Sequence, residues 1–160
     1  MPETVEFLVE RLKGEGEKTV DFFAALKDGQ WQSAVYTEGK TWSIRNVLAH
    51  FVTSEQAFLR LFANVQKGGT GAPENFDLDR YNASQQEKTR AQSPQELLTQ
   101  FRASRAAMIE LVSSMSTADL EKTGRHPFLG LTSLAEMIKM VYRHNQIHTR
   151  DLRHLLNDHP

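Results

Sequence analysis

Apolar side chains recur every three or four residues over four segments of the chain, which is the spacing of one face of an α-helix. The first segment covers residues 4–26. Gly16 falls on its apolar face, where close packing against another helix favours a residue without a side chain. The second segment begins at Ser43, a good N-cap residue, and ends at Gly68 and Gly69.

Two capping boxes mark the starts of the third and fourth helices. In the first box, Ser93 and Pro94 are followed by Glu96, so a helix is expected from this point to about Met115. In the second box, residues 133–136 open a helix that is expected to run to about residue 156.

Two longer connections join these helices. Residues 67–93 are too many for a tight turn between neighbouring helices, so we expect a structured crossover with a short helix from Asp77. Residues 116–132 are expected to be irregular, and no alternating pattern of useful length indicates a β-strand. The pattern predicts an all-α fold: a four-helix bundle with a long crossover between helices two and three, forming a single domain over residues 1–160.

Composition and charge narrow the class of protein. Lys and Arg number 19 against 20 Asp and Glu, a net charge of −1, so we expect no nucleic-acid partner. No apolar run reaches the roughly 18 residues of a membrane span, and no signal peptide opens the chain, so we expect no membrane partner and a cytoplasmic location. The chain has no cysteine, which excludes a thiolate metal site and a cysteine nucleophile.

His144 and His148 lie one helical turn apart on the expected fourth helix. At this spacing two side chains are about 40° apart around the helix axis and about 6 Å apart along it. Both fall on the apolar face that Val141 and Leu152 define, so the two imidazoles can converge on one metal ion. Two neutral histidines hydrogen-bonded within the core would give the same pattern.

His50 faces the bundle interior from the second helix, about 60° from the apolar stripe. Together with His144 and His148 it would supply three nitrogen ligands from facing helices and leave a coordination position open for water or substrate. Three unrelated histidines are the alternative. Asn145 follows His144, so the His-Glu-x-x-His motif of zinc proteases is absent.

Two carboxylates lie near these histidines in the sequence. Glu55 is about 140° from His50 around the helix, so it is not expected to share the ion. Asp151 follows His148 by three residues, and we expect it either to orient an imidazole or to form a surface ion pair with a neighbouring arginine.

The other three histidines are given no metal-binding role. His126 precedes a proline and is expected to be a mobile residue at the rim of the site. His154 and His159 lie near the end of the chain and are expected to be solvated.

Three passages of the sequence resemble the DinB-like family of metal-binding four-helix bundles, the damage-inducible or YfiT-like proteins. They are residues 42–50 (Trp-Ser-Ile-Arg-Asn-Val-Leu-Ala-His), residues 76–82 (Phe-Asp-Leu-Asp-Arg-Tyr-Asn) and residues 144–148 (His-Asn-Gln-Ile-His). The resemblance covers nearly the whole chain in order. It implies an up-down-down-up bundle, commonly dimeric, and a divalent metal ion, often nickel or zinc, held by His50, His144 and His148.

The resemblance also implies a range of activities. Members of the family include metal-dependent transferases and isomerases that use a low-molecular-weight thiol such as mycothiol or bacillithiol, and others look like metal-dependent hydrolases. The mycothiol-dependent isomerases often carry a carboxylate in the helix-four pair, where this chain has His144 and His148, which argues against an isomerase. We therefore expect a metal-dependent thiol transferase or hydrolase acting on a small-molecule substrate, with Asp79, Tyr81 and Asn82 at the rim.

Two alternatives to this enzyme stay open at the level of the sequence. One is a non-catalytic binding or stress-response module that uses the same bundle, and the other is a bundle without metal. No protein nucleophile or general base stands out, so the catalytic residues are unknown and the metal would carry most of the chemistry.

Three aromatic residues lie off the main apolar stripes, namely Phe7, Phe22 and Phe62. Because exposed apolar patches usually mark interfaces, we expect these residues to form the contact of a homodimer. The alternative is that the crossover covers them within one chain.

Overall fold

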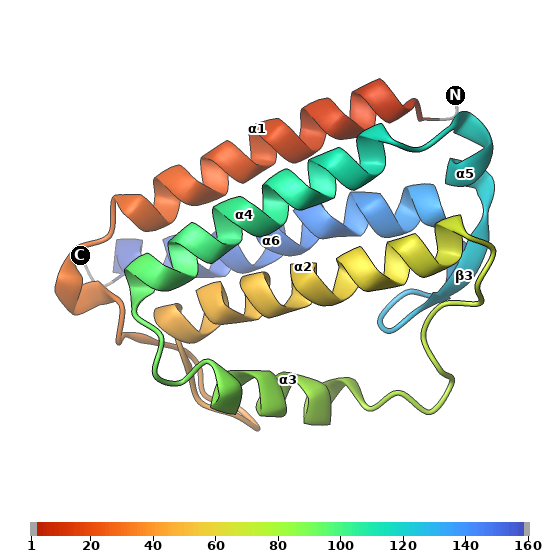
Figure 1. Cartoon of the computed structure of the whole chain (residues 1–160). Helices are drawn as coiled ribbons and strands as arrows, with labels where there is room; N and C mark the ends of the chain where they lie inside the picture. The colour runs from red at the N-terminus through yellow and green to blue at the C-terminus, as the bar shows by residue number, and fades with distance from the viewer. Residues whose placement is uncertain (1–2, 159–160) are drawn as a thin grey trace.

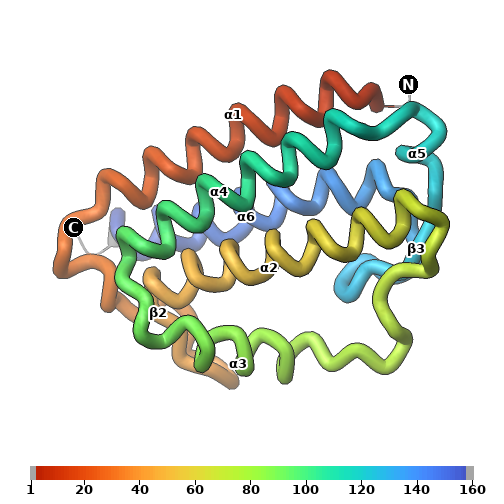
Figure 2. Tube along the Cα trace, viewed as in Figure 1, coloured from red at the N-terminus to blue at the C-terminus, as the bar shows by residue number. Residues whose placement is uncertain are grey.

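The computed structural model describes residues 3–158, which form a bundle of four long helices (Figure 1). The four are α1 (Val5–Ala24), α2 (Ile44–Gln66), α4 (Pro94–Ser113) and α6 (Leu134–Asp158). Figure 2 shows that α2 and α4 run in one direction, whereas α1 and α6 run in the other. The all-α fold and the up-down-down-up bundle are confirmed. None of the helices in this described part of the chain is both long and apolar enough to cross a membrane.

The interior of the bundle contains two apolar clusters with a polar layer between them. The cluster around the start of α1 includes Leu8, Phe62, Met108 and Met137, and the cluster around its end includes Phe23, Phe51, Phe101 and Leu152. Between these positions along the helices lie buried polar side chains, among them Glu55 on α2, Arg105 on α4 and Asn145 on α6. The candidate site is built at the level of this polar layer.

The crossover between α2 and α4 contains the helix α3 (Leu78–Lys88), which lies along the outside of α2 (Figure 1). As expected, Asp77 caps its N-terminus by accepting a hydrogen bond from the backbone N–H of Arg80. Two hydrogen bonds join α2 to α3. The side-chain amide of Asn46 donates to the side-chain oxygen of Gln86 at 2.8 Å, and the Gln86 amide donates to the backbone carbonyl of Asn46 at 2.7 Å. None of the residues of α3 is buried, so polar contacts hold this helix in place.

Two short antiparallel hairpins correct the expectation that the chain has no strand. The strand β1 (Ala34–Tyr36) pairs with β2 (Trp42–Ser43), and β3 (Thr123–His126) pairs with β4 (Gly130–Ser133). Strands of two to four residues are too short to show an alternating pattern. The stretch expected to be irregular also contains the helix α5 (Thr117–Glu121), and a turn of 3-10 helix, η1 (Asp28–Gln30), follows α1.

The two expected capping boxes differ in outcome. At α4, Ser93 and Glu96 bond each other's backbone N–H groups, as predicted. At α6, Ser133 accepts from the backbone N–H of Glu136, but the Glu136 carboxylate binds Lys139 at 2.8 Å instead of turning back. The second box therefore forms only in part, because an ammonium group one turn ahead competes for the carboxylate.

The aromatic residues expected at a dimer interface do not share an exposed face. Phe62 is fully buried, so the expectation for this residue is wrong. Phe22 is partly buried against Phe23 and beneath the guanidinium of Arg153, whereas Phe7 is 51% exposed. Only one of the three aromatic side chains thus offers apolar surface of the kind that the prediction required.

Candidate metal centre

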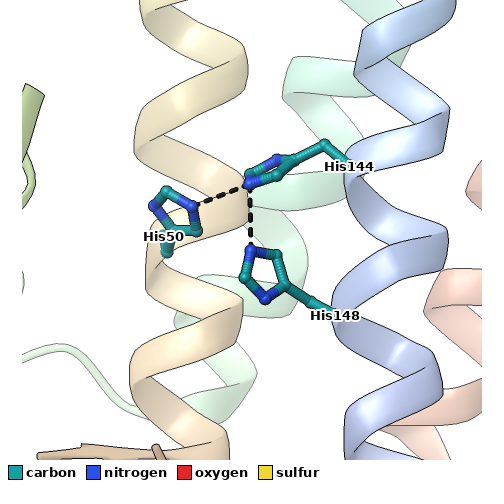
Figure 3. A group of neighbouring side chains, drawn as sticks. All are labelled: His50, His144 and His148. Carbon is teal, nitrogen blue, oxygen red and sulfur yellow. Dashed lines mark hydrogen bonds between the residues drawn. The ribbon is translucent and has the colours of Figure 1, made fainter. Parts of the chain in front are cut away.

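Three imidazole rings from two helices converge on one point inside the bundle (Figure 3). The Nε2 atom of His144 lies 2.8 Å from Nε2 of His50 and 3.1 Å from Nε2 of His148. Nitrogen ligands at ~2.0–2.1 Å from a divalent ion stand about 2.8–3.4 Å apart in the common coordination geometries, from about 90° to tetrahedral angles. The residues brought together are those that the sequence singled out, and their spacing and donor type fit a divalent metal ion.

Each ring is positioned by its place on a helix. His144 and His148 lie one turn apart on α6, so their side chains leave the same face, one above the other. His50 lies on α2, which packs against α6 along this face. Figure 3 shows the His50 ring reaching toward α6 from the opposite side. The packing of two helices thus completes a site that neither helix forms alone.

Burial keeps the three rings neutral. Loss of hydration, together with the neighbouring imidazoles, holds the pKa of His50 well below its usual range. Burial first, and then the nearness of His148, lowers the pKa of His144 to about 3, and burial lowers the pKa of His148 to about 4. A neutral imidazole is the form that binds a metal ion, so the protein presents these side chains in the ligating state at neutral pH.

The Nδ1 atoms of two rings have hydrogen-bond partners that set their orientation. Nδ1 of His148 lies 2.6 Å from the hydroxyl oxygen of Tyr36, and that hydroxyl donates to Asp151 at 2.6 Å. Nδ1 of His50 lies 3.2 Å from the Ser54 hydroxyl, one turn further along α2. With the proton on Nδ1, each ring turns an unprotonated Nε2 to the centre of the cluster, as ligation through Nε2 requires.

Asp151 therefore acts on the imidazole through an intervening hydroxyl group. Burial and the Asp151 carboxylate raise the pKa of Tyr36, so the phenol stays protonated and its O–H donates a hydrogen bond to the carboxylate. The phenol oxygen is then left to accept a hydrogen bond from Nδ1 of His148. The sequence placed Asp151 beside the site but gave no indication of Tyr36.

Aromatic rings close the sides of the cluster. The indole of Trp42 lies 5.0 Å from the His50 ring, and Phe51 lies 5.6 Å from the His144 ring. Trp42 and Phe51 are both buried. They shield the imidazoles from water on these sides, which accounts for the low pKa values.

Glu55 points into the core and binds Arg105, in agreement with the expectation that it does not join the histidines. Arg105 also donates to the side-chain oxygen of Asn145 at 2.6 Å and to the carbonyl of Leu12 at 2.9 Å. Because Asn145 is the neighbour of His144, this network ties the histidine-bearing part of α6 to α2 and α4. The buried charges thus compensate each other away from the histidine cluster.

A pocket of about 550 Å³ opens beside the three histidines. Asp79, Tyr81 and Asn82 line it, as expected for rim residues of the crossover. Its other walls come from α2, α6, both hairpins and the loop that precedes α3. The histidine cluster is therefore accessible to a small molecule, because the pocket has the size typical of ligand sites.

His126 corrects the expectation of a mobile rim residue, because its side chain is only 2% exposed. Its Nδ1 atom accepts the backbone N–H groups of Phe128 and Leu129, both at 3.1 Å. The ring packs at 5.2 Å from the Phe58 ring, and burial lowers its pKa to about 4. The tight turn after β3 needs an acceptor for these two N–H groups, and the His126 ring supplies it.

The remaining histidines lie at the end of the chain. His154 is exposed on α6, as expected, and His159 lies outside the described residues. His154 thus offers a reference histidine on the same helix as two of the three clustered rings.

Two polar residues of the site were missed in the sequence. Tyr36 lies in a three-residue strand, 112 positions from His148, so no local spacing connects them. Ser54 follows His50 by one helical turn, a spacing at which hydroxyl and imidazole groups meet on a helix, so this signal was present.

The fold and the site together define a class of protein: a four-helix bundle whose interior carries a histidine cluster suited to a divalent metal ion. The family model of the DinB superfamily matches residues 11–152. The chain belongs to the DinB superfamily, as its resemblance in sequence had indicated. The comparison with curated proteins gave no match.

Solved structures of the same fold include one protein described as metal-dependent and one described as dependent on a thiol. YfiT from Bacillus subtilis, described as a probable metal-dependent hydrolase with an unusual four-helix bundle topology, is 16% identical, with a TM-score of 0.81 over 99% of this chain and 89% of that chain. A mycothiol-dependent maleylpyruvate isomerase is 14% identical, with a TM-score of 0.77 over 94% of this chain and 61% of that one. At these identities the likeness concerns the fold.

A third solved structure corrects the expectation about nucleic acid. The colibactin self-resistance protein ClbS, 14% identical with a TM-score of 0.78 over 98% of each chain, is held in a complex with double-stranded DNA. Excluding nucleic acid on net charge was therefore wrong for this fold. The net charge of a whole chain does not describe how lysines and arginines are distributed over its surface, and the local distribution decides whether a phosphate backbone can bind.

Proposed function

We propose that this protein is an enzyme that depends on a divalent metal ion and acts on a small molecule, as a hydrolase or a thiol transferase. His50, His144 and His148 are its proposed metal ligands. The observation that carries the proposal is the convergence of three Nε2 atoms, 2.8 and 3.1 Å apart, at the wall of an open pocket. A structural metal site is usually closed by four protein ligands, whereas a site with three leaves room for a reacting group.

The ligand set favours chemistry at the ion. A divalent ion held by neutral imidazoles keeps its positive charge, and when bound it lowers the pKa of water or a thiol and polarises a carbonyl group. Tyr36 and Asp151 hold the His148 ring, and Ser54 holds the His50 ring. These residues orient the ligands, so that the ligands need little rearrangement when the ion binds.

The nucleophile is proposed to come from outside the protein. The chain has no cysteine, so a thiol must be supplied as a low-molecular-weight cosubstrate, and water is the nucleophile of a hydrolase. The descriptions of two proteins of this fold support both chemistries, since one is described as a probable metal-dependent hydrolase and the other as mycothiol-dependent. Nickel and zinc are the proposed ions, because both accept imidazole ligands.

The first test is the metal content of untagged protein purified without a metal resin. We expect about one divalent ion for each chain, and a tight one-site isotherm when Zn²⁺ or Ni²⁺ is titrated into the metal-free protein. His148→Ala should remove most of this affinity, whereas His154→Ala, on the same helix but exposed, should leave it unchanged. Equal affinities of the two variants would overturn the ligand assignment.

The second test is turnover by the metal-loaded protein. Activated esters and lactones report hydrolysis, and an aryl halide with cysteine, bacillithiol or mycothiol reports thiol transfer. We expect one of the two reactions to require the metal and to be lost in His50→Ala. Metal binding without turnover of either class would instead support the non-catalytic binding module.

A further inference from the structure

The pocket beside the histidines continues away from them between apolar side chains. These side chains are Phe58, Leu61, Phe76, Phe128, Met140 and Ile147. Three of them also expose much of their surface to solvent: Phe76 is 37% exposed, Ile147 is 44% exposed and Phe128 is 68% exposed. Large apolar groups that face solvent around a cavity mark a surface that becomes buried when a ligand binds.

The charged residues of the pocket favour a negative ligand. Lys40 and Arg60 are cations, and Asp79 is the one anion among the lining side chains of the described residues. The Lys40 ammonium lies 3.9 Å from the centre of the Trp42 ring, which in turn packs against His50. Because Trp42 contacts both Lys40 and His50, the Lys40 charge lies at the histidine end of the pocket. A bound divalent ion would add further positive charge there.

We propose that the pocket binds an amphiphilic anion: a small molecule with an aromatic or branched apolar body and a single negatively charged end group. The charged group lies by Lys40 and the three histidines, and the apolar body lies between Phe58, Phe128 and Ile147. The position of the charged end rests on the proposed function, since the ion supplies part of its attraction. The site for the apolar body depends only on the pocket walls and is independent of the metal.

The size of the pocket is consistent with this class of ligand. A volume of about 550 Å³ accommodates a body larger than one aromatic ring and falls within the usual range for small-molecule sites. A purely polar metabolite would leave the apolar walls in contact with water, and a neutral hydrocarbon would leave the cationic end without a partner. An amphiphilic anion satisfies both ends at once.

Trp42 allows binding to be measured directly. It lines the pocket, and the chain has a second tryptophan at position 31, so a Trp31→Phe variant leaves Trp42 as the fluorescent reporter. The probes are 4-phenylbutanoate, butanoate and 4-phenylbutan-1-ol, each titrated into metal-free and Zn²⁺-loaded protein. We expect 4-phenylbutanoate to bind at least about tenfold more tightly than butanoate in both forms, because the phenyl ring that butanoate lacks removes additional apolar surface from water.

Matched variants test the two ends separately. Phe128→Ser should weaken 4-phenylbutanoate binding about three- to tenfold. Phe7→Ser makes the same substitution at an exposed phenylalanine that does not line the pocket, so it should not alter binding. Lys40→Gln should weaken binding of the carboxylate but not of the alcohol, and Lys88→Gln, on the exposed side of α3, should affect neither.

The outcomes separate this inference from the proposed function. Butanoate binding as tightly as 4-phenylbutanoate would overturn the apolar site, and the alcohol binding as tightly as the carboxylate would overturn the anionic end. If Zn²⁺ does not bind but the phenyl preference persists, the proposed function fails and the apolar site stands. If Zn²⁺ binds and no phenyl preference is seen, only the present inference fails.

Discussion

Arg105 on α4 binds the carboxylate of Glu55 on α2 through two parallel hydrogen bonds, at 2.8 and 3.0 Å. Only 5% and 3% of the two side chains are exposed. A further bond from Arg105 reaches Asn145 at 2.6 Å, directly beside His144 on α6. One guanidinium group therefore holds together the two helices that carry the histidines.

Removing the guanidinium is expected to destabilise the protein strongly. Arg105→Met leaves the Glu55 carboxylate buried and uncompensated, which should lower the free energy of unfolding by about 3–5 kcal/mol at pH 7. The double variant Arg105→Met/Glu55→Leu, which removes both charges, should be more stable than the single variant. Urea unfolding measures both effects. As a control, Arg90→Met, which breaks an exposed pair with Glu87, should change stability by less than about 0.5 kcal/mol.

A single hydroxyl group is expected to tune the metal affinity. Tyr36→Phe removes the atom that joins His148 to Asp151 but keeps the aromatic ring, so the His148 ring loses its orienting partner. The affinity for Zn²⁺ should fall about 10- to 100-fold, with little change in helical content. Tyr81→Phe, in the same pocket but on the crossover, should leave the affinity unchanged. Calorimetric titration distinguishes the two, and equal affinities would contradict the role given to Tyr36.

Two glycines of α1 are expected to respond oppositely to the same substitution. A Cβ atom on Gly14 meets nothing within 4 Å, so Gly14→Ala should stabilise the helix by up to about 1 kcal/mol. A Cβ atom on Gly16 would lie 2.9 Å from Nη1 and 3.0 Å from Cγ of Arg105, whose position the ion pair fixes. Gly16→Ala should therefore destabilise the protein by about 1–3 kcal/mol. Thermal unfolding should shift upward for the first variant and downward for the second.

His126 is expected to make stability depend on pH. Burial lowers its pKa from 6.5 to about 4 in the folded chain, so between these values the unfolded chain binds a proton that the folded chain does not. The free energy of unfolding should thus fall as the pH drops from 6.5 toward 4, with a slope of up to about 1.4 kcal/mol per pH unit from this residue. The clustered histidines His50, His144 and His148 contribute in the same direction.

A conservative variant isolates the part of the slope that comes from His126. His126→Asn keeps an acceptor for the N–H groups of the turn but removes the titratable ring, so the slope between pH 6.5 and 4 should become shallower. His154→Asn, which changes an exposed ring, should leave the slope as it is. An unchanged slope in His126→Asn would contradict the neutral, buried state of this ring.

The helices and the histidine cluster could be predicted because both follow local rules. The apolar period and the cap residues Asp77 and Ser93 fixed the helix starts to within a residue or two. His144 and His148 share a face through helix geometry alone. His50 could be assigned to the same cluster because sites in helix bundles form between facing helices.

The parts that could not be predicted depend on long-range contacts. Tyr36 reaches His148 because β1 pairs with β2 beside the start of α2. No local spacing in the sequence connects this short strand with the histidine cluster. His126 was misjudged because a proline-containing loop usually lies at the surface, whereas here two backbone N–H groups draw the ring inward. Phe62 was misjudged because its helix is buried on more than one side.

The crossover gives the pocket a wall that is attached to the bundle by polar contacts and shares none of its core. The helix α3 buries none of its residues and is attached mainly through Asn46 and through Arg45, which donates to the carbonyls of Thr89 and Gln92. Its sequence is therefore almost free of the packing constraints that fix the four long helices. Residues of this wall can therefore change while the histidine cluster and the core stay as they are, so under the proposed function the crossover is the part of the chain where selectivity for a small molecule can be altered at little cost in stability.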